Sequence, residues 1–417
     1  MGINSCGTTM LDGGLFQNIG SVTWNTTAKT SNFTATSGSG FFVNTTSGAI
    51  TVTLPSSPSA GNIVGVKDYA NTADTNAITI GRNGSNIQGQ AADFQITTEG
   101  RSVFLVYVDS TKGWLVTGSA KNSDISSPQY VTATGGTITT VGDFKIHTFT
   151  GPGTFCVSNA GNACGSNKVD YMVVAGGGGG AANSNGAGGA GAGGFRESVP
   201  SPASWTASPL ASPGGSLPVS VQGYPITVGG GGAGHVGDPE NAGNGSSGSN
   251  SIFSSKTSAG GGGGGGAGAG VAGGSGGGSG QGQSGVGAGN TPPVSPPQGN
   301  SGAQSVPQER GAGGGGAGAA GSCVTGGAGV TSSINNSPVA RAGGGGGGAR
   351  CFPSVPGSAG SGGSGGGGAG AKGNNGTAGT ANTGGGGGGA GRKPGVGNFT
   401  GGAGGSGIVI IRYKYQN

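Results

Sequence analysis

Residues 171–180 read YMVVAGGGGG, and this stretch decides how the rest of the chain is organised. A continuous apolar run passes directly into five glycines, and 86 of the 109 glycines in the 417 residues lie between positions 176 and 407. Residues 408–415, IVIIRYKY, form a comparably apolar run near the C-terminus. Because both runs are rich in β-branched residues, we expect two strands that pair, the first buried on both faces. Their pairing would close the glycine region into an insertion.

Two structures are compatible with the glycine region. Glycine and serine at this density bury little apolar surface, which favours a flexible linker. Long glycine runs and scarce proline exclude collagen. The ordered alternative is a bundle of polyglycine II strands, which have three residues per turn and lie close enough for N–H···O and Cα–H···O bonds. We predict the bundle, because the glycine blocks alternate with segments that carry bulky or charged residues and because two strands enclose them.

The region before residue 120 has a different pattern. Short runs of β-branched and aromatic residues recur about every ten residues between turn residues, and the alternation of Ile50, Val52 and Leu54 predicts one buried face. We therefore predict an antiparallel β module within an all-β chain. The expected parts are an attachment segment (1–30), the β module (31–120), a linker (121–129), strands that open the glycine-rich domain (130–175), the polyglycine II-like region (176–407) and a closing strand (408–417).

Composition excludes several classes of protein. Only 7% of the chain is charged, and the formal net charge of +5 comes from scattered side chains, so we expect no nucleic-acid partner. No apolar run has the length of a membrane span, and the N-terminus lacks the pattern of a signal peptide, so we expect no membrane insertion and no export by that route.

Cysteine and histidine are scarce. Cys156 and Cys164 form one candidate disulfide pair, and Cys323 and Cys351 form another, although we expect free thiols at all four positions. His147 and His235 are the two histidines of the chain. We predict no metal site, no catalytic residue and no cofactor.

The β module carries a recognisable order of motifs. These are TVTLP (51–55), GVKDY (65–69), ITIGRNGSNI (78–87) and a closing pair that runs from Leu105 to Trp114. In this order they resemble a module of tailed-phage fibre and virion proteins, especially those of cyanophages. The resemblance implies a structural role, a homotrimer, and attachment through the N-terminal region to other tail or baseplate proteins.

The second half carries its own motifs. FTGPGTF (149–155), YPITVGGGGAG (224–234) and the terminal GGSGIVIIRY (404–413) look like the glycine-rich domain of phage tail-fibre and other virion proteins. The polyglycine II sandwich of certain phage adhesins is a looser analogy. It implies that the segments joining the glycine strands contact the host receptor.

Ring stacking and directional hydrogen bonds are what recognition of a glycan or an outer-membrane protein requires. The candidate receptor-binding residues on the joining segments are Trp205, His235, Asp238, Glu240, Glu309, Arg310, Arg350 and Phe352. For Trp205 and Phe352 the alternative is a small local core at an end of the bundle. For Arg341 and Arg350 we favour a solvated, solubilising role.

The sequence thus predicts a non-enzymatic tail-fibre or adhesin subunit of a bacteriophage that binds the host surface. The alternative is a capsid-attached fibre or decoration protein, and the third reading is a host-polysaccharide depolymerase. The expected location is the virion, as tail fibre or on the capsid surface, after synthesis in the host cytoplasm.

Overall fold

The computed structural model describes residues 22–117, 128–183, 185–237, 242–266, 268–282, 284–305, 310–351, 358–391 and 398–416. The chain forms two compact units. The first comprises residues up to Gln129 together with Ala163–Gly165, and the second comprises the remainder. The described residues form strands and no helix, which confirms the all-β prediction. They include no helix that has the length and apolarity to cross a membrane.

The first unit consists of two sheets. One has the strand order β1-β3-β5-β8-β9 and the other has the order β2-β4-β6-β7. The strands are β1 (Thr23–Lys29), β2 (Phe33–Thr34), β3 (Ser39–Val43), β4 (Ile50–Thr53), β5 (Ile63–Asp68), β6 (Ile78–Gly81), β7 (Phe94–Ile96), β8 (Ser102–Asp109) and β9 (Gly113–Thr117).

The prediction that this module is antiparallel was wrong for its first six strands. From β1 to β6 the chain enters the two sheets alternately, so each turn carries it from one sheet to the other. Neighbours within a sheet are then parallel, as shown by Phe41 opposite Val66 and by Val52 opposite Ile80. Only the pairs that involve β7, β8 and β9 are antiparallel. Turn residues at regular spacing suit a hairpin and a crossover equally well, and the pattern does not distinguish them.

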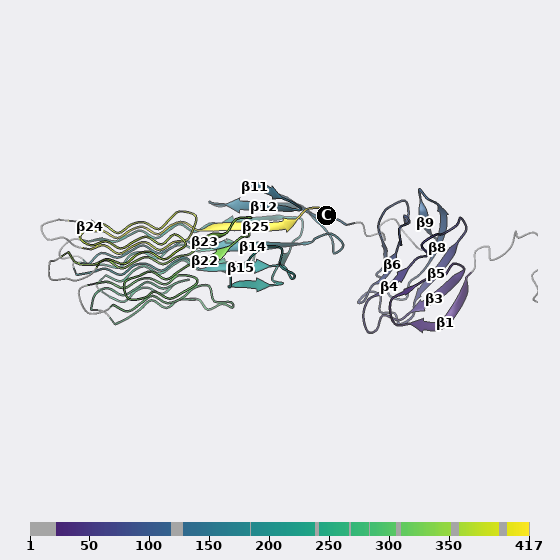
Figure 1. The fold of residues 1–417 in the computed structure, drawn as a ribbon, viewed down its shortest axis with the longest axis horizontal. Helices are drawn as coiled ribbons and strands as arrows, with labels where there is room; N and C mark the ends of the chain where they lie inside the picture. Colours follow the sequence, from purple (N-terminus) through teal and green to yellow (C-terminus); the bar gives the residue numbers. More distant parts are fainter. Residues whose placement is uncertain are drawn as a thin grey trace, which may run out of the picture. The chain divides into compact units, whose positions relative to one another are not determined.

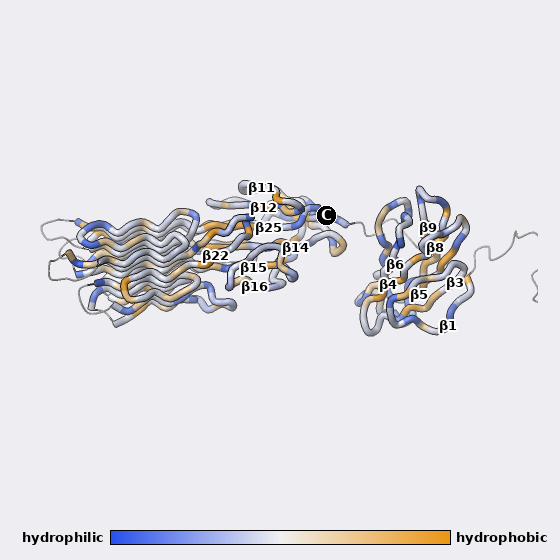
Figure 2. The backbone as a smooth tube through the Cα atoms, in the orientation of Figure 1, coloured by the Kyte–Doolittle hydropathy of each residue, from blue (hydrophilic) through white to orange (hydrophobic). Residues whose placement is uncertain are grey.

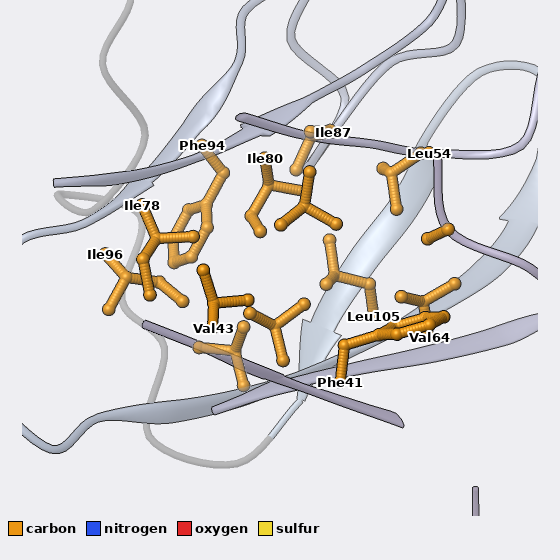
Figure 3. Close-up of a cluster of buried hydrophobic side chains, with 14 of the residues drawn as sticks. Phe41, Val43, Leu54, Val64, Ile78, Ile80, Ile87, Phe94, Ile96 and Leu105 are labelled. Atoms are coloured by element: carbon orange, nitrogen blue, oxygen red, sulfur yellow. The ribbon is translucent and has the colours of Figure 1, made fainter. Parts of the chain in front are cut away.

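The buried faces of the two sheets form one apolar core (Figure 3). Phe41 and Leu105 come from the first sheet, and Val52, Ile80 and Phe94 come from the second. Each such side chain contributes about 1.5–3 kcal/mol when it is fully buried. This core explains why alternating apolar residues dominate the sequence of the module.

The second unit contains two facing sheets and two further pairs of short strands. The strands are β10 (Val131–Thr134), β11 (Thr137–Val141), β12 (Phe144–Phe149), β13 (Gly153–Ala160), β14 (Lys168–Val174), β15 (Phe195–Val199), β16 (Ala211–Pro213), β17 (Leu217–Pro218), β18 (Gly223–Thr227), β19 (Val236–Gly237), β20 (Ser251–Phe253), β21 (Lys256–Ser258), β22 (Val330–Ser332), β23 (Val339–Arg341), β24 (Phe399–Thr400) and β25 (Ile408–Lys414). One sheet has the order β10-β13-β18-β20-β21, and the larger sheet, which we call the base sheet, has the order β11-β12-β25-β14-β15-β16 with β17 beside β14.

The two strands that bracket the glycine region pair with each other at the centre of the base sheet, as predicted (Figure 1). Tyr171 lies opposite Ile411, and Val174 lies opposite Ile408. Side chains of β14 alternate between two cores: Tyr171 and Val173 belong to the core shared with the second sheet, and Met172 and Val174 belong to the core on the other face. The expected burial of this strand on both faces is confirmed.

The segments between β14 and β25 form what we call the glycine bundle, which comprises the described parts of residues 176–194, 229–250, 259–329 and 342–407. The segment that continues β14, residues 176–181, shows its geometry. Residues three apart donate their N–H groups to the same neighbouring segment. Gly176 and Gly179 donate to Ser249 and Ser246, Gly177 and Gly180 to Gly405 and Gly402, and Gly178 and Ala181 to Gly191 and Gly188. A repeat of three residues is the repeat of a polyglycine II helix.

The carbonyl groups of the same segment follow the same rule with three other neighbours. Residues three apart accept N–H bonds from one segment. Gly176 and Gly179 accept from Gly261 and Gly264, Gly177 and Gly180 from Gly232 and His235, and Gly178 and Ala181 from Gly387 and Ala390. Segment 176–181 therefore has six neighbours, three antiparallel and three parallel. The ordered bundle is the structure of the glycine region, and the linker alternative does not apply.

The absence of side chains is what permits this packing. A Cβ atom at Gly177 would lie 2.1 Å from the carbonyl oxygen of Gly385, and one at Gly180 would lie 2.0 Å from that of Gly388. At Gly230, in contrast, a Cβ would meet no atom within 4 Å. The glycines are therefore a packing requirement in the interior of the bundle and are replaceable at some positions on its surface.

This difference predicts the effect of two matched pairs of substitutions. Added Cβ atoms at Gly263 and Gly345 would lie 1.9 Å from the oxygen of Gly245 and 2.0 Å from that of Gly387, so the double variant Gly263→Ala/Gly345→Ala should lose about 3 kcal/mol or more of unfolding free energy. Calorimetry would show this as a lower Tm.

The control is Gly230→Ala/Gly268→Ala, since neither added Cβ atom meets a neighbour within 4 Å. We expect this pair to leave Tm nearly unchanged. Equal effects of the two pairs would contradict the packed bundle.

Candidate functional site at the outer end of the bundle

The bundle segments reverse direction at two ends. We call the end beside the base sheet the inner end and the opposite end the outer end, where Figure 1 shows β24. Backbone pairing joins the turns there: Ala182 bridges to Gly243, and β19 pairs with β24. In Figure 2 the segments through the bundle are pale, and hydrophilic residues appear at the outer end. Hydrophilic residues that interrupt the glycines are therefore found at this end of the bundle.

Asparagine side chains hold several outer turns in place. The Asn375 Oδ1 accepts the N–H of Thr400 at 2.8 Å, and the Asn183 Nδ2 donates to the carbonyl of Gly266 at 2.6 Å. Asn244 also bonds this turn, because its Oδ1 accepts the N–H of Gly266 at 2.8 Å. Short amide side chains bond readily to nearby backbone groups, which is why asparagine suits these positions. The turns are therefore fixed by hydrogen bonds even though they bury few side chains.

Three of the predicted receptor-binding residues lie at the outer end. Arg310 forms an isolated bridge with Ala349, the residue before Arg350. His235 donates its backbone N–H to Gly180 at 3.0 Å and lies with its ring close to Gly243. Asp238, Glu240, Glu309 and Phe352 lie outside the described residues. Of the predicted residues, the structure thus places Arg310, Arg350 and His235 at one end of the bundle.

Trp205 lies at the other end. Its ring packs 4.7 Å from the Cζ of Arg412 in β25, and the ring of Phe144 packs against the same guanidinium at 4.4 Å. The Nε1–H of Trp205 donates to the Oε1 of Glu197 at 3.4 Å. These contacts are those of a small local core, the alternative that the sequence left open for this tryptophan.

A buried group of charges around Trp205 was missed by sequence reasoning. Glu197 is 2% exposed, and its carboxylate accepts hydrogen bonds from the N–H of Ser208 at 2.9 Å and from the hydroxyl of Ser332. Arg341 is 4% exposed, so its expected solvated role was wrong. The reason is that β23 places Arg341 opposite Val330, within a hairpin that packs on the base sheet. Burial lowers the pKa of the Arg341 guanidinium, and the nearby charge of Glu197 opposes that change. No local pattern marks these charges, because their partners are far apart in sequence.

Burial shifts the titration of two groups in this region. Burial raises the pKa of the Asp170 carboxyl, against hydrogen bonds from Ser216 and Ser198 that lower it. Burial also lowers the pKa of the Arg412 guanidinium, and the charge of Asp170 opposes that change. Asp170 and Arg412 lie opposite each other in the paired strands β14 and β25. Both shifts disfavour the charged forms, so these buried groups belong to the junction of the base sheet without stabilising it by their charge alone.

The other candidate residues have simpler outcomes. Cys156, Cys164, Cys323 and Cys351 are all free of disulfides. Within the described ranges, no group of three or more His, Cys, Asp or Glu side chains is arranged to hold a metal ion. His147 is fully buried, where its ring nitrogens face the Gly135 carbonyl at 2.7 Å and the Tyr413 hydroxyl at 3.0 Å.

Comparison with known proteins gives one finding about the family. The family model described as a glycine-rich domain matches residues 150–414, which is more than half of the chain. No curated protein matches the chain.

The packing of Trp205 predicts a structural defect on its removal. Trp205→Ala should lower the unfolding free energy by about 2 kcal/mol. It removes the ring that packs on the Arg412 guanidinium and the Nε1–H that donates to Glu197. Trp205→Phe keeps a stacked ring and should lose less than half as much. Urea unfolding of the three proteins measures this order, and a Trp205→Ala protein as stable as the parent would refute the packing role.

Proposed function

This chain belongs to the glycine-rich domain family, and from that premise we propose that it is a bacteriophage tail-fibre or adhesin subunit that binds the host cell surface with the outer end of its bundle. The proposed ligand is a surface glycan or an outer-membrane protein. We propose binding without catalysis, by side chains of the turns described above.

The geometry of the bundle is the observation that carries this proposal. Its interior is almost free of side chains, and backbone hydrogen bonds in several directions hold its segments, so it is a stiff support with little chemistry of its own. The turns at one end carry cations, amides and exposed apolar groups such as Val236, which is 54% exposed. Recognition surfaces on loops that a rigid scaffold positions are a common solution in binding proteins.

The assignment to a phage is supported by the motifs of the first unit. TVTLP overlaps β4, GVKDY overlaps β5, and Leu105 to Trp114 joins β8 to β9, so the motifs that resemble fibre modules coincide with the framework of its core. We propose that this unit attaches the chain to other tail or baseplate proteins and forms a homotrimer in the virion.

Steric blocking of one end tests the proposed binding surface. A short epitope inserted between Asn374 and Asn375, which are exposed at the outer end, should reduce binding of the labelled protein to host cells at least tenfold. The same epitope between Val221 and Gln222, exposed residues of the loop before β18, should leave binding unchanged. Tm of both variants serves as the folding control.

Retained binding by the Asn374–Asn375 insertion would refute the proposed surface. Immunogold labelling of virions tests the location separately. Gold at the tail fibres is expected, whereas gold on the head would replace the tail-fibre proposal with the capsid-attached alternative.

A further inference from the structure

Three cations lie on neighbouring segments at the outer end of the bundle. Arg310 bridges to Ala349, and Ala349 bridges in turn to Lys372. Arg350 follows Ala349 directly, on the segment to which both of the other segments bridge. Backbone bonds fix this arrangement, because the N–H of Gly311 donates to Gly348 at 2.9 Å and that of Ala349 donates to Ala371 at 2.9 Å.

The backbones of the three residues lie on adjacent bridged segments, and side chains of this length can span that separation to reach one ligand. Bridged segments lie about 5 Å apart. This spacing between the backbones is comparable to the Debye length of about 8 Å at physiological ionic strength, so the three charges act together on a ligand. All three side chains are half-buried, where an ionic interaction is screened less than at a fully exposed site. Each also has an interaction within the chain, so the inference rests on their neighbouring backbone positions.

The local charge balance is strongly positive. Between residues 300 and 407 the sequence has one acidic residue, Glu309, and six basic residues, of which Arg341 is buried at the inner end. Among the described residues after 176, Glu197 is the carboxylate, and it is buried at the inner end. Asp238, Glu240 and Glu309 lie outside the described residues, and the described part of the outer end carries cations and no carboxylate.

We propose that Arg310, Arg350 and Lys372 form a binding site for the phosphate or carboxylate groups of a host-surface polysaccharide. Guanidinium groups bind such oxyanions in a bidentate manner, and the lysine adds a mobile point charge. This inference rests on the proposed function, because it names the ligand chemistry of the same outer end. It goes beyond the proposed function in predicting that charge, and not shape alone, selects the receptor.

The test uses the full chain and four probes. These are a phosphorylated lipopolysaccharide, polygalacturonate, neutral dextran and vesicles of phosphatidylglycerol. The parent should bind the lipopolysaccharide or polygalacturonate, and this binding should weaken as salt rises, whereas dextran should not bind. Arg310→Gln/Arg350→Gln/Lys372→Gln should weaken binding at least tenfold. The control Lys112→Gln/Lys145→Gln/Lys256→Gln removes the same charge elsewhere and should change it less than twofold.

Each other outcome counts against the proposal. Equal losses in the two triple variants would show a response to net charge alone, and vesicle binding as tight as glycan binding would assign the cluster to lipid headgroups. If the first variant fails to fold, Arg310→Lys/Arg350→Lys keeps the charge and should lose only the bidentate part, about threefold or more. No loss in either variant overturns the site.

Cell binding separates this proposal from the function on which it rests. A triple variant that binds cells like the parent, while the Asn374–Asn375 insertion abolishes binding, would refute the cationic site and retain the adhesin. A parent that binds no host cell would refute the adhesin itself.

Discussion

The second unit depends on backbone hydrogen bonds whose direction changes from one residue to the next along each glycine segment. A β-strand bonds to two neighbours in one plane, whereas segment 176–181 bonds to six neighbours around its axis. Such a lattice buries almost no large apolar side chain. Its stability comes from many modest bonds, each contributing about 1 kcal/mol, and from close contact of backbones that side chains would hold apart.

The base sheet sets the register of this lattice. Val174 pairs with Phe195 in the sheet, and the same antiparallel register continues into the bond from Gly178 to Gly191. Serine hydroxyls complete the junction, because Ser251 and Ser258 donate to the carbonyls of Val174 and Val173 at 2.8 Å. The apolar strands β14 and β25 bury side chains that the glycine segments lack, and this burial stabilises the unit at the point where the bundle begins. The buried charges around Arg412 belong to this junction.

The sequence predicted the parts of the structure that side chains encode. The runs at 171–175 and 408–415 are long and β-branched, so their pairing and burial followed directly. The repeat of three followed from the excess of glycine and the exclusion of collagen. The partner of each glycine segment was not predictable, since glycine has no side chain to select a neighbour. The parallel winding of the first unit was missed because its turns fit two topologies. The burial of Arg341 was missed because Glu197 lies far away in sequence. The neighbouring positions of Arg310, Arg350 and Lys372 became visible only with the bundle.

Amide hydrogen exchange of the glycine segments tests the account most directly. If segment 176–181 is bonded on six sides, its amides should be protected to the same degree as those of Met172 and Val173 in β14, and they should exchange only when the unit unfolds. Exchange of these amides within seconds, while β14 stays protected, would show a flexible glycine region and contradict the lattice.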